Sequence, residues 1–188
     1  MSFLANQLSS QPPILASPLR DIPYWYAVYT YPRHEKAVTE QLEAKYIETF
    51  LPTFVTESRW KDRRVQIQTP AFPRYVFVRS NKSERSKVFA VPGVVRILSY
   101  NGTPAPIDEL EIEAVKLCLE RGATLEAHTS IEIGEHVRVR SGMLEGVVGL
   151  VVRCKNARRL IVPISLINQS IAVEVDANLL EPLNAQNN

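Results

Sequence analysis

The chain has 188 residues, of which 45% are hydrophobic and 22% charged, and its net charge of +2 excludes an overall positive field that would mark a nucleic-acid-binding protein. Its two cysteines lack a C-x-x-C pattern, which argues against a disulfide scaffold or a zinc knuckle and favours a reducing compartment. Without a basic, apolar leader or an apolar run of roughly 18 residues, the sequence predicts a cytoplasmic protein with no membrane contact.

The first part of the chain predicts an arm, a strand and a helix. Residues 1–22 are polar and aperiodic and contain Pro and Ser, which is typical of a disordered arm. Alternating side chains over 24–31 predict a strand that Pro32 ends. Residues 33–47 switch to helical spacing. The buried stripe of this helix is expected to consist of Val38, Leu42 and Tyr46.

Two strand-like runs follow, at 48–60 and 65–80, joined by a polar turn or hairpin tip at 61–64. The second run contains Pro70 and Pro73, which cannot donate hydrogen bonds to a sheet. The opening of this segment is therefore expected at an edge, a turn or a bulge, with regular alternation only after it.

The next segment predicts a short helix at 82–91, a fourth strand at 94–100 and a longer helix at 108–122. Asp108 is the expected N-cap of the longer helix, and Gly122 its expected C-cap. The expected buried stripe consists of Leu110, Ala114, Leu117 and Cys118.

This order predicts an α+β fold of two domains. Short connections between the strands favour an antiparallel sheet with helices, of split β-α-β type, over residues 23–122. Residues 123–132 are the expected linker. Short Val/Ile-rich strands with turn signals over 133–183 predict a small all-β barrel, followed by a tail at 184–188.

Basic residues concentrate between Arg59 and Arg96, where ten bases face two acids and the window carries a charge of +8. Such a window could face phosphate or an acidic partner, or it could be a solvated loop and strand edge. A second basic group, at the predicted barrel loop, leaves RNA contact and a solvated hairpin tip open. It consists of Arg153, Lys155, Arg158 and Arg159.

An enzymatic function has little support in the sequence. The three histidines have no nucleophile or carboxylate at usable spacing, and no P-loop or dinucleotide fingerprint is present. The run "HEKAV" is not a zinc motif, because Val38 stands where H-E-x-x-H has its second histidine. We therefore expect no catalytic residue, no metal site and no cofactor.

Several motifs across both predicted domains resemble those of NusG-type transcription factors. In order they are "WYAVYTYPRHEKAVTEQL", "FLP", "AFPRYVFVR", "VPGVVRIL" and "PAPID". The run "GEHVRVRSGMLEGVVGLVV" is similar to the KOW motif of the same proteins, with Gly134, Gly142, Gly146 and Gly149 at matching places. "RHEK", "RWKDRR" and "FPRYVFVR" together most resemble the specialised UpxY and RfaH-like branch.

This resemblance implies a four-stranded antiparallel sheet with helices, called the NGN domain, linked to a five-stranded KOW barrel. It implies a monomeric elongation or antitermination factor that binds the clamp helices of the RNA polymerase β′ subunit and suppresses pausing or termination. It also implies that the barrel recruits Rho or a ribosomal protein, as a specialised paralogue acting on particular operons. A KOW-type RNA- or ribosome-binding module that never touches polymerase is the alternative.

The resemblance assigns clamp binding to an aromatic corner. The implied residues are Tyr29, Phe72, Pro73, Arg74 and Tyr75. Aromatic side chains lose little rotamer entropy and make good anchors, although Phe72 and Tyr29 could also be core residues of a small sheet, as we expect for Phe77. Where the family commonly has glycine, this chain has Arg74; we expect its side chain in solvent rather than on an acidic partner.

Further contacts are expected on the basic surface. Arg33, His34 and Lys36 begin the first helix, where free backbone N–H groups suit phosphate. Specialised relatives read non-template DNA with this surface, and nascent RNA is another possible ligand. The alternative is a solvent-exposed first turn without a ligand. Trp60, Arg63 and Arg64 form a second candidate nucleic-acid contact, with packing the alternative for the tryptophan. Arg85 and Lys87 are candidates for a second polymerase contact. Ile164, Leu166 and Ile167 are the expected partner face of the barrel. Val/Ile alternation favours a free barrel over the helical hairpin that a minority of relatives hold against the clamp site.

Overall fold

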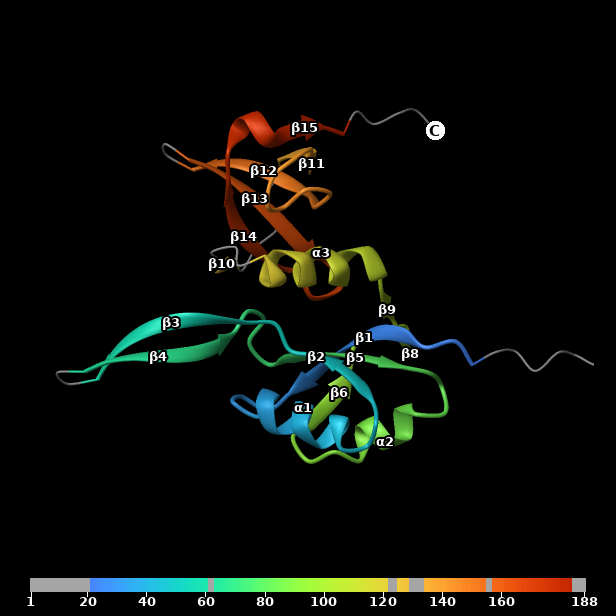
Figure 1. Ribbon diagram of the computed structural model, residues 1–188. Helices are drawn as coiled ribbons and strands as arrows, with labels where there is room; N and C mark the ends of the chain where they lie inside the picture. The colour runs from blue at the N-terminus through green and yellow to red at the C-terminus, as the bar shows by residue number, and fades with distance from the viewer. Residues whose placement is uncertain (1–20, 61–62, 122–124, 129–133, 155–156, 184–188) are drawn as a thin grey trace, which may run out of the picture.

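The computed structural model describes residues 21–60, 63–121, 125–128, 134–154 and 157–183. The expected tail and all but the last two residues of the expected arm lie outside the described residues. Two sheets lie on opposite sides of the helix α3, which is Glu109–Glu120 (Figure 1). The chain thus has the predicted α+β order, a sheet with helices followed by a strand-rich C-terminal part.

The first sheet has the strand order β2-β5-β1-β6, and every neighbouring pair is antiparallel. Its strands are β1 Tyr24–Thr30, β2 Glu48–Phe50, β5 Tyr75–Ser80 and β6 Val94–Ile97. The predicted four-stranded antiparallel sheet is therefore confirmed. The short strand β9, Pro106–Ile107, adds a fifth member by pairing with the start of β1.

Helices α1, Glu35–Glu43, and α2, Arg85–Phe89, cover one face of this sheet. Val38 and Leu42 of α1 are fully buried, as predicted, among valines of β1 and β5. Tyr46 was expected in the same stripe, and this expectation is wrong: the helix ends at Glu43, and Tyr46 takes a left-handed φ of 59° and is 96% exposed. The reversal buries Ile47 instead, whose N–H donates to the Leu42 carbonyl at 3.1 Å.

Helix α3 covers the opposite face. The Asp108 side chain accepts from the Leu110 N–H at 3.0 Å, so the predicted N-cap is confirmed. The buried residues are Ile112, Val115 and Cys118, whereas Leu110, expected in the stripe, is 72% exposed. The difference arises because α3 packs against β1 on one side and against the C-terminal sheet on the other, which a single apolar stripe does not describe.

A long two-stranded hairpin extends beyond the first sheet, formed by β3, Thr53–Trp60, and β4, Arg63–Pro70 (Figure 1). Arg63 and Arg64 belong to β4 rather than to a turn, so the predicted hairpin tip is shorter than expected. The chain then turns through residues 71–74 before β5, which confirms the irregular corner expected from the two prolines. A second small hairpin pairs β7, Ser99–Tyr100, with β8, Thr103–Pro104.

The C-terminal sheet has six strands in the order β10-β14-β13-β12-β11-β15. Their bounds are β10 Leu125–His128, β11 Glu135–Val139, β12 Val148–Cys154, β13 Ala157–Ile164, β14 Gln169–Val175 and β15 Leu180–Pro182. Two 3-10 turns, Ser165–Ile167 and Ala177–Leu179, connect the later strands. The barrel expected from the resemblance had five strands; β10 is the sixth, and it lies within the segment expected to be linker, paired with β14.

This sheet contacts the first domain through α3. The carboxylate of Glu111 on α3 accepts from the Ser165 hydroxyl at 2.6 Å and from its backbone N–H at 3.2 Å. At the other end of α3, the Arg121 guanidinium donates to the carbonyls of Met143 at 2.7 Å and Glu145 at 3.3 Å. Both ends of one helix are therefore tied to the barrel.

Replacing Cys118 by alanine is expected to make stability less sensitive to alkaline pH. Burial raises the pKa of this thiol from 9.0 to about 11. A raised pKa means that the native thiol keeps its proton while the unfolded thiol loses it, so the stabilisation present below pH 9 is lost as the pH rises toward 11.

Urea denaturation at pH 8 and pH 11 measures this effect. The wild type should lose about 2 kcal/mol more than Cys118→Ala across that range, since each pKa unit corresponds to about 1.4 kcal/mol. Equal losses in the two proteins would show that the Cys118 thiol ionises in the native state as it does in the unfolded chain.

Candidate protein-binding site

Three side chains form a row across the first sheet. Tyr29 on β1 is paired with Tyr75 on β5 on one side and with Arg96 on β6 on the other. The two tyrosine rings are 5.3 Å apart at an interplanar angle of 57°, and both are half-buried, whereas Arg96 is exposed. Lys116 of α3 lies over Trp25, at the other end of β1, so the helix covers that end and leaves the Tyr29 row accessible.

Arg74 completes this cluster from the corner before β5. Its guanidinium lies over the Tyr29 ring, 4.3 Å from the centroid, and the Arg96 guanidinium lies 5.1 Å from the same centroid. The expectation that Arg74 faces solvent is therefore wrong, because the side chain is half-buried and stacked. We call Tyr29, Arg74, Tyr75 and Arg96 the tyrosine–arginine cluster.

The backbone of Arg74 is held in an unusual conformation. Its φ is 70°, in the left-handed region where glycine is unstrained and an arginine costs about 1–2 kcal/mol. Two hydrogen bonds hold it there: the Arg74 N–H donates to the Glu35 carboxylate at 2.8 Å, and the Thr30 N–H donates to the Arg74 carbonyl at 2.8 Å. Glu35, only 6% exposed at the start of α1, was not singled out in the sequence.

Phe72 does not belong to the exposed surface. It is 1% exposed and packs edge-on against Phe77 with the ring centroids 5.5 Å apart. The prediction of a surface anchor is therefore corrected to its stated alternative, a core aromatic; Phe77 is fully buried as expected. Pro73 is exposed at the corner beside them.

The surroundings of Tyr75 keep its hydroxyl protonated. Burial raises the pKa of Tyr75 above its ordinary value of 10.0, and neighbouring Tyr29 raises it further, whereas Arg96 and Arg74 act in the opposite direction. The phenol is thus a neutral hydrogen-bonding group with an apolar ring, and the positive charge of the cluster comes from the two arginines.

The other residues predicted to contact nucleic acid lie outside the tyrosine–arginine cluster. Arg33, His34 and Lys36 are all exposed at the start of α1, and the His34 ring lies 5.9 Å from that of Tyr31. Arg64 is exposed on β4, where Trp60 pairs with Arg63 across the hairpin; the side chains of the latter two lie outside the described residues.

Arg85 is engaged within the domain rather than free for a second contact. Its guanidinium donates to the Tyr26 hydroxyl and lies 4.8 Å from that ring's centroid. Nearby, the Asp21 carboxylate accepts from the backbone N–H groups of Lys82 and Ser83, which lowers its pKa. Lys87, by contrast, is exposed on α2.

Comparison with known proteins shows the family to which the chain belongs. The family model described as "Transcription termination factor nusG" matches residues 23–116, half of the 188-residue chain. The chain belongs to the NusG family. All four residues of the tyrosine–arginine cluster lie inside the matched region.

Curated NusG relatives match over most of their length. The chain is 26% identical to the transcription termination/antitermination protein NusG of Rickettsia prowazekii, covering 88% of this chain and 93% of the relative. It is 28% identical to that of Staphylococcus aureus, covering 85% and 95%. A solved structure on domain interaction in Thermotoga maritima NusG is 23% identical, with a TM-score of 0.49, covering 86% of this chain and 97% of that chain. The family match and the curated relatives identify the protein as a NusG-like transcription factor.

The NusG-like barrel does not present the expected partner face. Ile164 is fully buried and Ile167 is 8% exposed, so the prediction that they form an open apolar surface is wrong; Leu166 is half-buried. The 3-10 turn over Ser165–Ile167 is the reason, since it directs Ile167 into the core while Ser165 binds Glu111.

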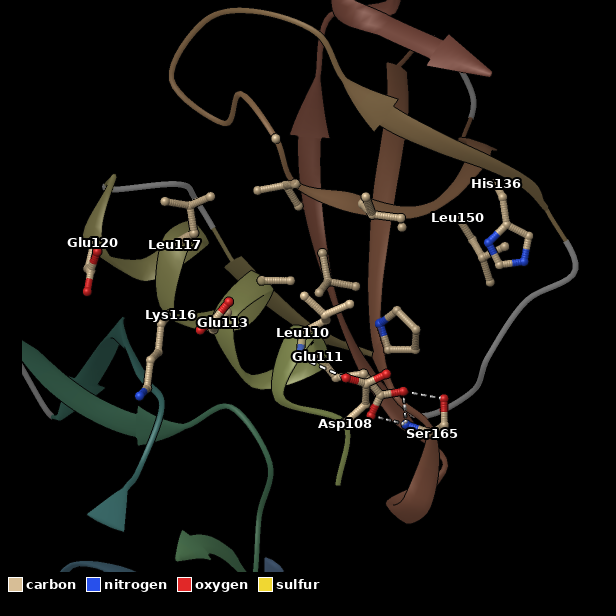
Figure 2. Close-up of a pocket in the computed structure, with 17 residues that line it drawn as sticks. Asp108, Leu110, Glu111, Glu113, Lys116, Leu117, Glu120, His136, Leu150 and Ser165 are labelled. Atoms are coloured by element: carbon tan, nitrogen blue, oxygen red, sulfur yellow. Dashed lines mark hydrogen bonds between the residues drawn. The ribbon is translucent and has the colours of Figure 1, made fainter. Parts of the chain in front are cut away.

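A groove of about 720 Å³ lies between α3 and the barrel, and no residue pattern in the sequence indicated it (Figure 2). Its walls combine apolar side chains from both parts with carboxylates along the helix. They include Leu110, Glu111, Leu117, His136, Leu150 and Pro163. Within the described part of the chain, no three His, Cys, Asp or Glu side chains gather as metal ligands, and no helix is long and apolar enough to cross a membrane.

Proposed function

We propose that this NusG-like protein binds the clamp helices of the RNA polymerase β′ subunit through the tyrosine–arginine cluster. The observation that carries the proposal is the half-exposed pair of Tyr29 and Tyr75 on the open end of the first sheet, inside the region that the family model matches. Half-buried aromatic rings that keep fixed positions lose little entropy on binding and make strong anchors.

The proposed consequence is an elongation factor that reduces pausing or termination and acts as a specialised paralogue on particular operons. Its relatives from Rickettsia prowazekii and Staphylococcus aureus carry the name transcription termination/antitermination protein. Exposed Arg33, His34 and Lys36 are available to the displaced non-template strand. We further propose that the barrel recruits Rho or a ribosomal protein; of the three residues expected there, Leu166 is the one that is not buried.

The test is calorimetric titration of the full chain with a β′ clamp-helix fragment, at low and moderate salt. The wild type should bind at both salt concentrations, and Tyr75→Ala should lose about 2 kcal/mol of binding free energy. Tyr100→Ala is the matched control, since this tyrosine is 75% exposed on β7, outside the cluster, and should bind as the wild type does.

The same titration can also refute polymerase binding. A wild-type chain that ignores the fragment but binds RNA with an affinity that falls steeply with salt would refute polymerase binding. It would favour an RNA- or ribosome-binding module instead.

A further inference from the structure

The tyrosine–arginine cluster brings two cations to one aromatic ring. Arg74 reaches Tyr29 from the corner and Arg96 reaches it from β6, with guanidinium carbons 4.3 Å and 5.1 Å from the ring centroid. Each contact is favourable by itself, because the face of a tyrosine ring attracts cations. The two guanidinium groups repel each other, however, since both lie within about 10 Å, where screening by salt is incomplete.

Among the described residues, the ion pairs do not include Arg74 or Arg96. The ion pairs there involve other arginines, Arg79 with Glu48 and Glu109, and Arg159 with Glu174. Glu35 accepts the backbone N–H of Arg74, and the Nε of Arg74 is buried with no hydrogen-bond acceptor. A buried donor without an acceptor is unfavourable, so the polar groups of Arg74 are not fully satisfied within the chain.

The backbone conformation of Arg74 also indicates a binding role. Arg74 keeps a left-handed φ of 70°, which glycine would adopt without strain. Strained residues that the surrounding structure holds in place are enriched at binding sites. What arginine provides at this corner and glycine cannot is the guanidinium over Tyr29.

We propose that Arg74 and Arg96 together donate hydrogen bonds to a carboxylate of the protein partner, an inference that rests on the proposed polymerase binding. A guanidinium group presents parallel N–H donors that match a carboxylate, and two such groups beside one ring define where the carboxylate must lie. A phosphate has similar chemistry. Nucleic acid is disfavoured here because a base that stacked on Tyr29 would compete with the guanidinium groups that lie against its ring.

The resulting surface selects its partner by two features at once. Tyr29 and Tyr75 supply the apolar contact, and the arginine pair requires an acidic side chain at a fixed distance from it. An apolar helix without that acid would leave the arginines unpaired in the interface, which is strongly unfavourable when water is excluded.

The test is a set of double-mutant cycles between the full chain and the β′ clamp-helix fragment. Arg96→Gln should weaken binding about tenfold, and Arg96→Lys should weaken it less because it retains the charge. Each acidic residue of the fragment is then changed to its amide. One of them should show a coupling of at least fivefold with Arg96→Gln. Arg138→Gln removes the same charge from exposed β11 and should have no effect.

Failure of this inference is distinguishable from failure of the proposed function. Wild-type affinity in Arg96→Gln, together with weakened binding by Tyr75→Ala, would overturn the carboxylate site and leave polymerase binding intact. A wild-type chain that binds a single-stranded DNA oligonucleotide but not the fragment, with Arg96→Gln weakening the DNA complex, would overturn both and assign the arginines to phosphate.

Discussion

Replacing Phe72 by alanine is expected to lower the free energy of unfolding by about 3–5 kcal/mol, the range measured for buried phenylalanines. The Phe72 side chain is 1% exposed and meets Phe77 edge-on with a centroid distance of 5.5 Å. Its removal would leave a cavity between the first sheet and the base of the β3–β4 hairpin. The neighbouring backbone cannot close that cavity freely, because the Ala71 N–H donates to the Pro52 carbonyl and the Tyr75 N–H donates to the Phe72 carbonyl.

Urea denaturation of the full chain, followed by tryptophan fluorescence, measures this loss. Tyr75→Ala is the control, because its side chain is half-exposed and its removal should cost clearly less. A stability loss below 1 kcal/mol in Phe72→Ala would contradict a core role and would return Phe72 to the binding surface. The stability measurement is also needed before binding data on this variant are interpreted. An unfolded Phe72→Ala protein would bind polymerase weakly whether or not Phe72 contacts it.

Most of the fold was predictable from the sequence because it rests on local signals. Period-two alternation located β1 and β5, helical spacing located α1 and α3, and the two prolines located the corner at residues 71–74. Alternation also placed Tyr75 and Phe77 on one face. It could not tell how deep each side chain lies, because depth depends on which end of the sheet α3 covers.

The tyrosine–arginine cluster was predictable only in part. Tyr29, Arg74 and Tyr75 were expected at the site, whereas Arg96 was not. Its place beside Tyr29 follows from the register of β1 against β6, which is shifted at Tyr29 and Thr30 and leaves no trace in the sequence. The stacked Arg74 was missed for a similar reason: Glu35 holds its backbone from 39 residues away.

In the barrel, the sequence-based prediction failed for a different reason. Ile164 and Ile167 were expected at a partner face because they belong to a more apolar stretch of the barrel. Ile164 is buried as the last residue of β13. Ile167 is buried because the chain makes a 3-10 turn between β13 and β14 and then takes a left-handed φ of 52° at Asn168. Residues Leu125–His128, expected to be linker, form β10 because β14 offers them an edge. Both outcomes depend on contacts that local composition does not encode.

The glycines of the barrel were matched to the KOW motif by resemblance, and the structure supplies physical reasons for them, most clearly at Gly149. A Cβ at Gly149 would lie well inside van der Waals contact of the Ile161 carbonyl oxygen and 3.1 Å from Cδ1 of Leu160. The first obstacle is backbone, so it cannot rotate away. Gly149 is therefore where β12 and β13 approach too closely for any side chain.

Gly149→Ala is accordingly expected to destabilise the barrel by about 3 kcal/mol, at the upper end of the usual cost of overpacking. The added methyl group must push β12 away from β13 beside Leu160 and Ile161, both fully buried. Hydrogen exchange of the full chain measures the effect: protection of barrel amides such as Ile161 should fall on the order of 100-fold, since about 1.4 kcal/mol corresponds to a factor of ten.

Gly146→Ala provides the matched control within the same motif. Gly146 has a φ of 88°, but a Cβ there would meet no atom within 4 Å, so only backbone strain of about 1 kcal/mol is expected. Amides of β1 and β5 should keep far more of their protection in Gly149→Ala than barrel amides do, because their hydrogen-bonded ladder does not include the barrel. Equal destabilisation by the two substitutions would show that β12 and β13 can separate at Gly149 at little cost. An equal loss of protection in β1 would instead show that α3, tied to the barrel at Ser165 and Met143, makes the two sheets one cooperative unit.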